Sequence, residues 1–199
     1  RGSPSLGDEN SGLRCVLGNA GNIDHFVKSL IKENDLVVSL LPATMHHTIA
    51  EVVIEYGKQM VTASYISDQM AQLQERAVKA QVPIVNEMGL DPGIDIMTTA
   101  KLFNRIRGEG GKITKYVSLC GALVQPENSD CPMGYKFSWS PRGVLTAITR
   151  PTRFFAGGEW FEVPGQYLYH LIQPLSGFKG LDLHWIPNGN AEKYAKIYD

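Results

Sequence analysis

The 199-residue sequence has few cysteines, and none is placed for a metal site or a disulfide framework. Cys15, Cys120 and Cys131 are odd in number, widely spaced and without a C-x-x-C pair. Without such a pair, neither a structural zinc site nor a disulfide framework is supported, and no metal site is predicted. Free thiols favour a reducing compartment. We expect a cytoplasmic protein, and the mitochondrion stays open as the alternative.

Long apolar runs and runs of like charge are also missing. No segment approaches the roughly 18 consecutive apolar residues that a membrane-spanning helix needs. The 19 basic and 20 acidic residues give a formal net charge of -1 and are not clustered. Nucleic acids and membrane surfaces bind concentrated basic patches, so neither is expected as a partner. A hydrophobic content of 43% predicts a globular core.

The phosphate-binding motif of dinucleotide domains is absent too. Such a domain opens with a strand, a G-x-G-x-x-G turn and a helix, whereas residues 18–21 form only a G-x-x-G. We therefore expect that the first β-α-β unit is missing. The chain by itself should then bind a dinucleotide weakly and be inactive. The residue that distinguishes NAD from NADP would lie in that unit, so the choice between the two stays open.

What the sequence does contain, from residue 35 on, is an alternation of strands and helices. Short runs rich in β-forming residues occupy 36–41, 60–63 and 82–85, and the first has the composition of a strand buried on both faces. Helical spacing of apolar residues covers 23–30, 44–57, 67–77 and 91–107. The expected N-caps are Thr44, Ser67 and Asp91, and Gly57 is expected to end a helix. Repeated β-α units predict a parallel sheet with right-handed crossovers.

Ligands of such sheets sit at the carboxyl ends of the strands. Those ends are formed by Leu41 and Pro42, by Ala63, Ser64 and Tyr65, and by Gly89, Leu90 and Asp91. His46 and His47 follow the first strand end, early in a helix. We expect them to face solvent, with a cleft-facing histidine as the alternative.

After Gly111 the pattern changes to alternating and turn-rich segments. It predicts a strand over 113–120, a hairpin around a Gly157-Gly158 turn, and a strand near Trp185. A helix after Ser140 should turn Val144, Leu145 and Ile148 inward. The expected fold is therefore α/β, the C-terminal part of a Rossmann-like parallel sheet (1–110) followed by an α+β substrate and dimerisation domain with a largely antiparallel sheet (111–199).

Several motifs occur together in a characteristic order. They are D-L-V-V-S-L-L-P (35–42) with His46, V-T-A-S-Y (61–65), G-L-D-P-G-I-D (89–95), C-G (120–121), P-E (126–127) and G-Y-K-F-S-W-S-P-R-G-V (134–144). This set resembles the saccharopine dehydrogenase family, from about residue 34 to the end.

The resemblance implies an oxidoreductase of lysine metabolism that is usually a homodimer. Members transfer hydride between NAD or NADP and the secondary amine of saccharopine. The resulting imine is hydrolysed to glutamate and aminoadipate semialdehyde. By motif match, the dinucleotide contacts are Leu41, Ala63, Leu90, Asp91 and Pro92. The saccharopine contacts are Ser64, Tyr65, Asp91 and Arg142, and the candidate catalytic residues are Asp91 and Cys120. An Arg suits a carboxylate, and an Asp suits an ammonium group, of such a substrate.

Two positions depart from the family pattern. Ala43 stands where the family usually has Tyr, and Gly189 stands where a family Arg binds a substrate carboxylate. Both departures suit a non-catalytic descendant that keeps the fold for dimerisation or regulation. The loss at Gly189 also suits a related dehydrogenase of the carboxynorspermidine type, whose substrate lacks one carboxylate. These two alternatives stand beside saccharopine dehydrogenase itself.

Overall fold

The computed structural model describes residues 16–19, 23, 25–132, 134–178 and 181–198. It forms two compact units, one ending at Thr99 and the other beginning at Ala100. The domain boundary predicted at residue 110 stays a prediction. Cys15 and half of the G-x-x-G segment lie outside the described residues.

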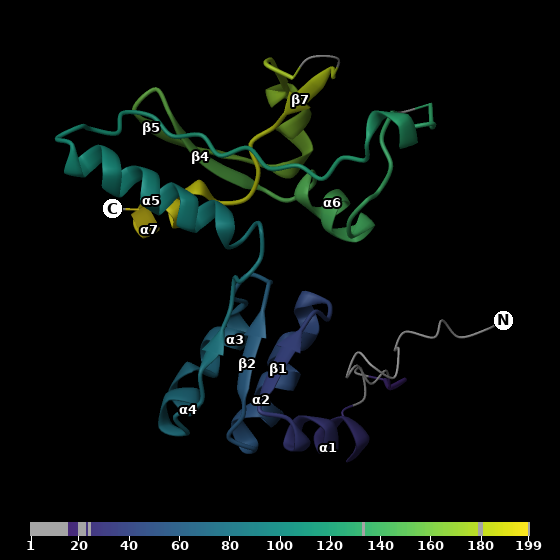
Figure 1. Cartoon of the computed structure of the whole chain (residues 1–199). Coiled ribbons are helices and arrows are strands. Elements are labelled where there is room, and N and C mark those ends of the chain that lie inside the picture. Colours follow the sequence, from purple (N-terminus) through teal and green to yellow (C-terminus); the bar gives the residue numbers. More distant parts are fainter. Residues whose placement is uncertain (1–15, 20–22, 24, 133, 179–180, 199) are drawn as a thin grey trace. The chain divides into compact units, whose positions relative to one another are not determined.

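The first unit is built on a parallel sheet, as the sequence predicted. Its strands are β1 (Leu36–Ser39), β2 (Gln59–Thr62) and β3 (Ile84–Val85), in the order β1-β2-β3 (Figure 1). Both pairings are parallel, with Val37 opposite Met60 and Met60 opposite Ile84. All three strands therefore end at one edge of the sheet.

Helices bury one face of this sheet. They are α1 (His25–Glu33), α2 (His46–Glu55), α3 (Asp68–Gln72) and α4 (Gln74–Lys79), with a 3-10 turn η1 (Ala43–Met45) before α2. The buried core includes Ile31, Ile49, Val52, Val53, Met60, Met70, Leu73, Ala77 and Val82. The expectation that β1 is buried on both faces is wrong, because Leu36 and Val38 are 50% and 60% exposed. Their side chains lie on the sheet face opposite that core.

Of the predicted helix ends, those at Ser67 and Gly57 are confirmed and those at Thr44 and Asp91 are wrong. Ser67 caps α3, accepting a hydrogen bond from the Met70 amide at 3.2 Å, and α2 gives way to Gly57 as expected. Thr44 is not a cap, because it lies inside η1 and α2 begins only at His46. Asp91 is not a cap either. The chain makes a tight turn after β3, so α5 (Ile94–Gly108) begins three residues later.

Gly93 makes this tight turn possible. Its φ is +144°, and a Cβ there would lie 2.3 Å from the Gly89 carbonyl oxygen. We expect Gly93→Ala to lower the free energy of unfolding by about 3 kcal/mol or more, since backbone strain alone costs about 1–3 kcal/mol and the overlap adds to it. Urea denaturation measures the loss. Gly57→Ala is the control, because its φ of +63° costs about 1–2 kcal/mol but no atom crowds the new methyl. Equal losses in both variants would contradict the prediction.

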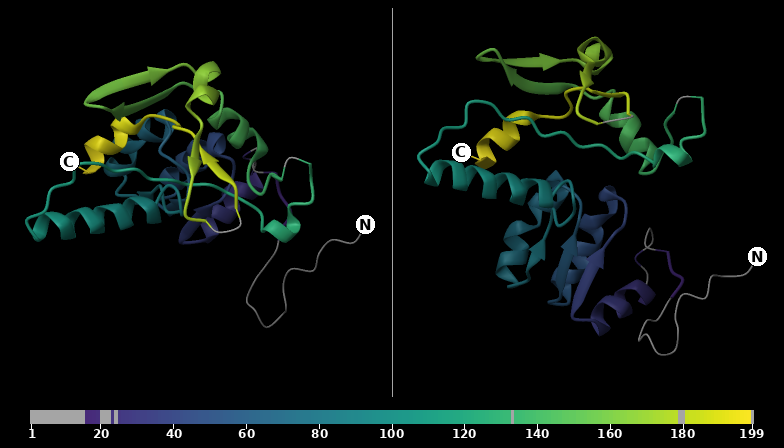
Figure 2. Two further views of the ribbon diagram at one scale, coloured as in Figure 1. Left: turned by 90° about the horizontal axis from the view of Figure 1, so that it is seen from above. Right: turned by 45° about the horizontal axis from the view of Figure 1, so that its top comes forward.

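In the described part of the second unit, the strands form two separate antiparallel pairs. Hairpin β4 (Thr152–Ala156) and β5 (Glu159–Val163) turns at Gly157-Gly158, as predicted (Figure 2). The other pair is β6 (Gln173–Leu175) and β7 (Leu183–Trp185), which confirms the strand near Trp185. The remaining elements are η2 (Pro126–Asn128), α6 (Pro141–Ala147), η3 (Gly165–Leu171) and α7 (Ala191–Tyr198). The mixed α/β fold class is thus confirmed.

Two details predicted for this unit are wrong. Residues 113–120, all of them described, form no strand. An alternating sequence fixes which side chains share a face, but a strand also needs a neighbouring backbone with which to form hydrogen bonds. Val117 and Leu119 are correspondingly about half exposed, at 51% and 48%. In α6, Leu145 is 52% exposed instead of facing inward, while Val144 and Ile148 are half-buried.

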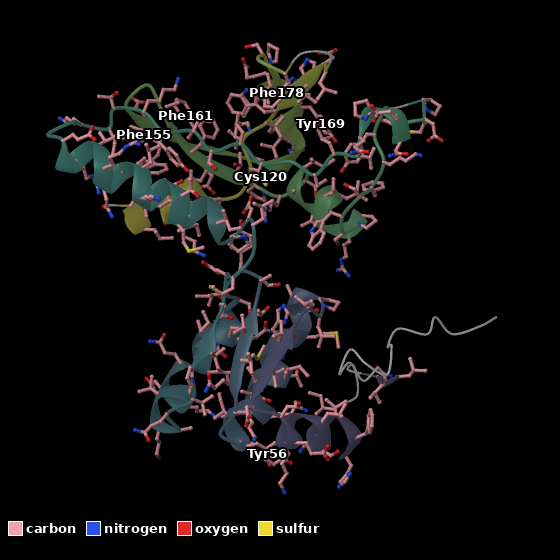
Figure 3. All side chains as sticks on the ribbon, viewed as in Figure 1. Tyr56, Cys120, Phe155, Phe161, Tyr169 and Phe178 are labelled. Carbon is pink, nitrogen blue, oxygen red and sulfur yellow. The ribbon has the colours of Figure 1, made fainter. Side chains whose placement is uncertain are left out.

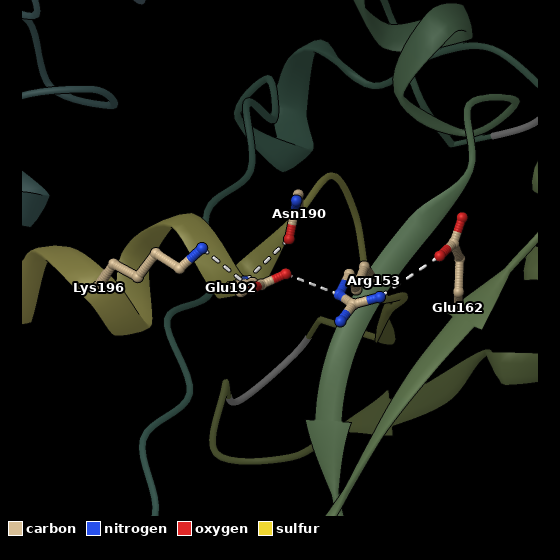
Figure 4. A network of polar contacts seen from close by, with 5 residues as sticks. All are labelled: Arg153, Glu162, Asn190, Glu192 and Lys196. Carbon is tan, nitrogen blue, oxygen red and sulfur yellow. Dashed lines mark hydrogen bonds and ion pairs between the residues drawn. The ribbon is translucent and has the colours of Figure 1, made fainter.

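Arg153 ties α7 to the hairpin (Figure 4). Its guanidinium lies 2.9 Å from a Glu192 carboxylate oxygen and 3.5 Å from one of Glu162, and it stands over the Trp160 ring at 5.3 Å. Its amide donates to the Gly189 carbonyl at 2.8 Å. This fixes the segment just before α7 against β4.

Candidate active site

The ends of β2 and β3 are held together by main-chain bonds. The Met88 amide donates to the Thr62 carbonyl and the Glu87 amide to the Ser64 carbonyl, both at 3.1 Å. Gly89 lies so close to Ala63 that a Cβ would be 3.2 Å from the Ala63 methyl. The loop after β3 is therefore packed on the end of β2, and the predicted strand-end residues share one rim.

Tyr65 and Asp91, both predicted to contact substrate, meet at this rim. The Tyr65 hydroxyl donates a short hydrogen bond to Asp91 Oδ1, and both side chains are exposed. Beside them, the Ile66 amide donates to Glu87 Oε1 at 3.2 Å. Because Tyr65 follows β2 and Asp91 follows β3, the contact joins two strand ends into one polar group open to a ligand.

The rim also has an apolar side that suits a flat ring. Leu40 and Leu90 are 80% and 69% exposed, and Leu41 and Ala63 are half-buried. Pro92 is buried, and its carbonyl accepts a hydrogen bond from the Gly89 amide at 2.9 Å.

One buried acceptor at this edge has no protein partner. Asn86 follows β3 directly, and its Oδ1 is buried without a hydrogen-bond partner among the described residues. A buried acceptor left unpaired is costly, so a ligand donor is the natural partner. A nicotinamide has an apolar ring and a carboxamide donor, the two kinds of group that exposed leucines and an unpaired acceptor can bind.

His46 is buried beside this rim, and the environment expected for it from the sequence is wrong. The expectation of a solvent-facing side chain is wrong for it, since it is 2% exposed. Its Nδ1 lies 2.8 Å from Ser39 Oγ, and its Nε2 lies 2.8 Å from Ser64 Oγ and 3.1 Å from Thr62 Oγ1. The available signal was the position, because His46 begins the helix that follows a strand whose last residue is a serine, after a turn of six residues. His47 is half-buried.

Burial lowers the pKa of His46 from its ordinary value of 6.5. As the pH falls, an unfolded chain takes up this proton before the folded protein does. The stability that neutral His46 contributes is therefore complete above pH 6.5 and is lost below it, toward the lower pKa of the folded state.

We expect urea denaturation to show this loss as the pH falls below 6.5, and His46→Gln to reduce the pH dependence because it removes the titrating group. The other four histidines are present in both proteins, so the difference between wild type and variant isolates the contribution of His46. An identical pH dependence in the two proteins would contradict the prediction.

Arg142 and Cys120 belong to the second unit. Arg142 is exposed in the first turn of α6, where Ser140 caps the helix through the Gly143 amide at 3.2 Å. It makes no ion pair with any described residue, so its guanidinium is available to an anion. Cys120 is exposed on the loop after α5 (Figure 3). Whether these two residues join the rim of the first unit stays a prediction.

A guanidinium also lies beside Gly189, where the family resemblance places an Arg. A Cβ on Gly189 would be 3.2 Å from Arg150 Nη2. Arg150 is exposed and, within the described residues, unpaired. The positive charge missing at position 189 is thus present next to it on another side chain.

Among the residues described, no three His, Cys, Asp or Glu side chains lie together as metal ligands. In the part of the chain that the structure covers, no helix is both long and apolar enough to cross a membrane.

A parallel β-α sheet with a ligand rim at its carboxyl edge, followed by a second α+β unit, is the layout of a nucleotide-dependent dehydrogenase. Two family models match the chain. They are the saccharopine dehydrogenase NADP binding domain over residues 9–85 and the saccharopine dehydrogenase C-terminal domain over residues 89–199. The chain belongs to the saccharopine dehydrogenase family.

Curated relatives and a solved structure agree. The chain is 38% identical to saccharopine dehydrogenase [NADP(+), L-glutamate-forming] of Schizosaccharomyces pombe, over 89% of the chain and 39% of the relative. It is 40% identical to the mitochondrial alpha-aminoadipic semialdehyde synthase of Rattus norvegicus, over 94% and 20%. Apo saccharopine dehydrogenase (L-Glu forming) from Saccharomyces cerevisiae superposes with a TM-score of 0.84 at 34% identity, over 96% and 42%. The chain therefore spans at most about two-fifths of these proteins.

Proposed function

We propose that the full-length protein is a saccharopine dehydrogenase that uses NADP and releases glutamate. The observation that carries the proposal is the polar group of Tyr65 and Asp91, with Ser64, beside an apolar strand-end rim. The names of the S. pombe and S. cerevisiae relatives both print NADP(+) and L-glutamate formation, and so support the cofactor and the product of the proposal.

When bound, NADP supplies the hydride acceptor for the carbon next to the secondary amine. The same oxidation removes a proton from the amine nitrogen, and we assign its acceptance to Asp91. The Tyr65 hydroxyl donates to Asp91 and holds the carboxylate toward the substrate. Water then adds to the imine, and the carbon–nitrogen bond breaks to give an aldehyde and the amino group of glutamate.

The substrate carboxylates need cationic and hydroxyl partners. Arg142 offers a bidentate guanidinium, and Ser64 offers a hydroxyl. Cys120 is proposed as a second catalytic group at the edge of the site. Leu41, Ala63, Leu90 and Pro92 are proposed to line the dinucleotide.

A steady-state assay of the full-length protein tests the proposal. Saccharopine with NADP should yield reduced cofactor and equimolar glutamate, and NAD should be the poorer cofactor. A well-folded protein with no turnover in either cofactor would favour the non-catalytic alternative, a dimerisation or regulatory module.

Gly189 favours a second candidate, a dehydrogenase of the carboxynorspermidine type. The unpaired guanidinium of Arg150 beside Gly189 weighs against it, because the charge for another carboxylate is still available. Parallel assays with both substrates separate the candidates. A higher kcat/KM for the substrate that lacks one carboxylate would support the second.

For assembly and location we propose a homodimer in the cytoplasm, with the mitochondrion as the alternative because the rat relative is named mitochondrial. Apolar side chains on one face of the hairpin support a protein interface, since the cross-strand partners Phe155 and Trp160 are 56% and 37% exposed. The small-molecule substrate is the expected ligand, without nucleic acid or membrane. Light scattering of the full-length protein at low salt should give twice the mass of one chain.

A further inference from the structure

The buried His46 lies between the interior of the sheet and the substrate rim. Ser39 ends β1 and is 4% exposed, and among the described residues its hydroxyl has one hydrogen-bond partner, His46 Nδ1. On the other side of the ring, Nε2 faces the hydroxyl of the half-buried Ser64. The imidazole therefore connects an enclosed hydroxyl to one at the rim.

The direction of these two hydrogen bonds depends on how many donors and acceptors the ring and the hydroxyls can offer. A neutral imidazole has one N–H donor and one acceptor nitrogen. The two shortest contacts, both 2.8 Å, are those with Ser39 and Ser64. If Nδ1 carried the proton, the hydroxyl proton of buried Ser39 would have no acceptor, which is costly. The hydroxyl of Thr62, which is 1% exposed, makes the opposite demand on Nε2, but at 3.1 Å it lies farther from the ring than Ser39 does at 2.8 Å. The geometry therefore favours Ser39 as the donor to Nδ1, with Nε2–H donating to Ser64 Oγ.

This direction decides what Ser64 presents to a ligand. Because the Ser64 oxygen accepts from Nε2–H, its own hydroxyl proton is turned away from the ring. Thr62 keeps the Ser64 main chain in place, since Thr62 Oγ1 accepts from the Ser64 amide at 3.4 Å. The three side-chain partners of His46 are uncharged hydroxyls, of Ser39, Thr62 and Ser64.

We propose that His46 is a positioning residue that makes the Ser64 hydroxyl a hydrogen-bond donor to a carboxylate of the substrate. The inference rests on the proposed function for the nature of the ligand. The relay itself, Ser39 to His46 to Ser64, lies wholly within the first unit. Lowering of the His46 pKa by burial supports it, because the relay needs the neutral ring.

The direction of the relay is read without any substrate. Nitrogen-15 NMR of the five histidines, with His46→Gln used for assignment, should show His46 as the Nε2–H tautomer at neutral pH. Ser39→Ala should shift it toward the other tautomer, because the donor to Nδ1 is gone. An Nδ1–H tautomer in the wild-type protein overturns the inference, whatever the substrate is.

Substrate affinity of the full-length protein then tests the role. Calorimetry with saccharopine should show about ten- to hundredfold weaker binding for Ser64→Ala and for His46→Phe, as expected for one hydrogen bond to a charged group. The double variant Ser64→Ala/His46→Phe should bind saccharopine no more weakly than either single variant. The affinity for NADP should stay within about threefold of the wild-type value. His46→Gln should recover most of the saccharopine affinity that His46→Phe loses.

Thr99→Val is the matched control, because it removes a buried hydroxyl of the same unit that donates to the Asp95 carbonyl instead. Additive losses in the double variant, or wild-type affinity in a folded His46→Phe protein, overturn the inference. If His46→Phe fails to fold, Ser39→Ala carries the same comparison. If the wild-type protein neither binds nor oxidises saccharopine, the proposed function fails, and the tautomer measurement still decides the relay.

Discussion

Asp91→Asn is expected to lower kcat of the full-length enzyme by about 10²–10⁴-fold, the usual contribution of a positioned acid–base group. The amide keeps the size of the side chain and can still accept the Tyr65 hydrogen bond, but it cannot take a proton from the amine. KM for saccharopine should change much less than kcat. Steady-state kinetics with saturating NADP measures both.

The control for this variant is Asp68→Asn, an exposed aspartate in the first turn of α3. It should leave kcat unchanged. Tyr65→Phe should give a smaller loss than Asp91→Asn, since it removes only the donor that orients the carboxylate. If Asp91→Asn retained more than half of wild-type kcat, Asp91 would not be the proton acceptor.

Arg142→Ala is expected to lower kcat/KM for saccharopine by about 30- to several-thousandfold, which corresponds to about 2–5 kcal/mol for a hydrogen-bonded charge pair in a desolvated site. Arg142→Lys should recover only part of the loss, because an ammonium cannot make the bidentate contact. The effect should fall mainly on KM.

Arg105→Ala is the matched control. Arg105 is exposed in the last turn of α5 and, within the described residues, has no ion-pair partner. Its loss removes an equal charge without removing a proposed ligand contact. Equal effects of the two substitutions would mean that Arg142 acts only through the overall electrostatic potential of the protein and not through a contact with the substrate.

The parallel sheet could be predicted because its evidence is local. The runs at 36–41, 60–63 and 82–85 are separated by helical patterns, and a β-α-β succession leaves few topologies. Ser67 and Gly57 were found for the same reason, since each acts within one turn of its own helix. Once the strands are parallel, the common edge of Ser64, Tyr65 and Asp91 follows from topology alone.

The errors arose where a local pattern depends on a distant partner. Residues 113–120 alternate as a strand does, but alternation cannot supply the neighbouring backbone. Thr44 and Asp91 are good capping residues, yet the turns that follow Pro42 and Gly89 place the helix starts further along the chain.

By itself, the sequence determined the order of the β-α units, the edge at which a ligand is expected, and the family motifs that give Ser64, Tyr65, Asp91 and Arg142 their expected roles. Only the tertiary structure decided that Tyr65 bonds to Asp91, that Arg150 lies beside Gly189, and that His46 is buried between Ser39 and Ser64. The physical reason is that periodicity fixes which face a residue lies on. Hydrogen bonds between side chains on different strands depend instead on how those strands and their loops pack.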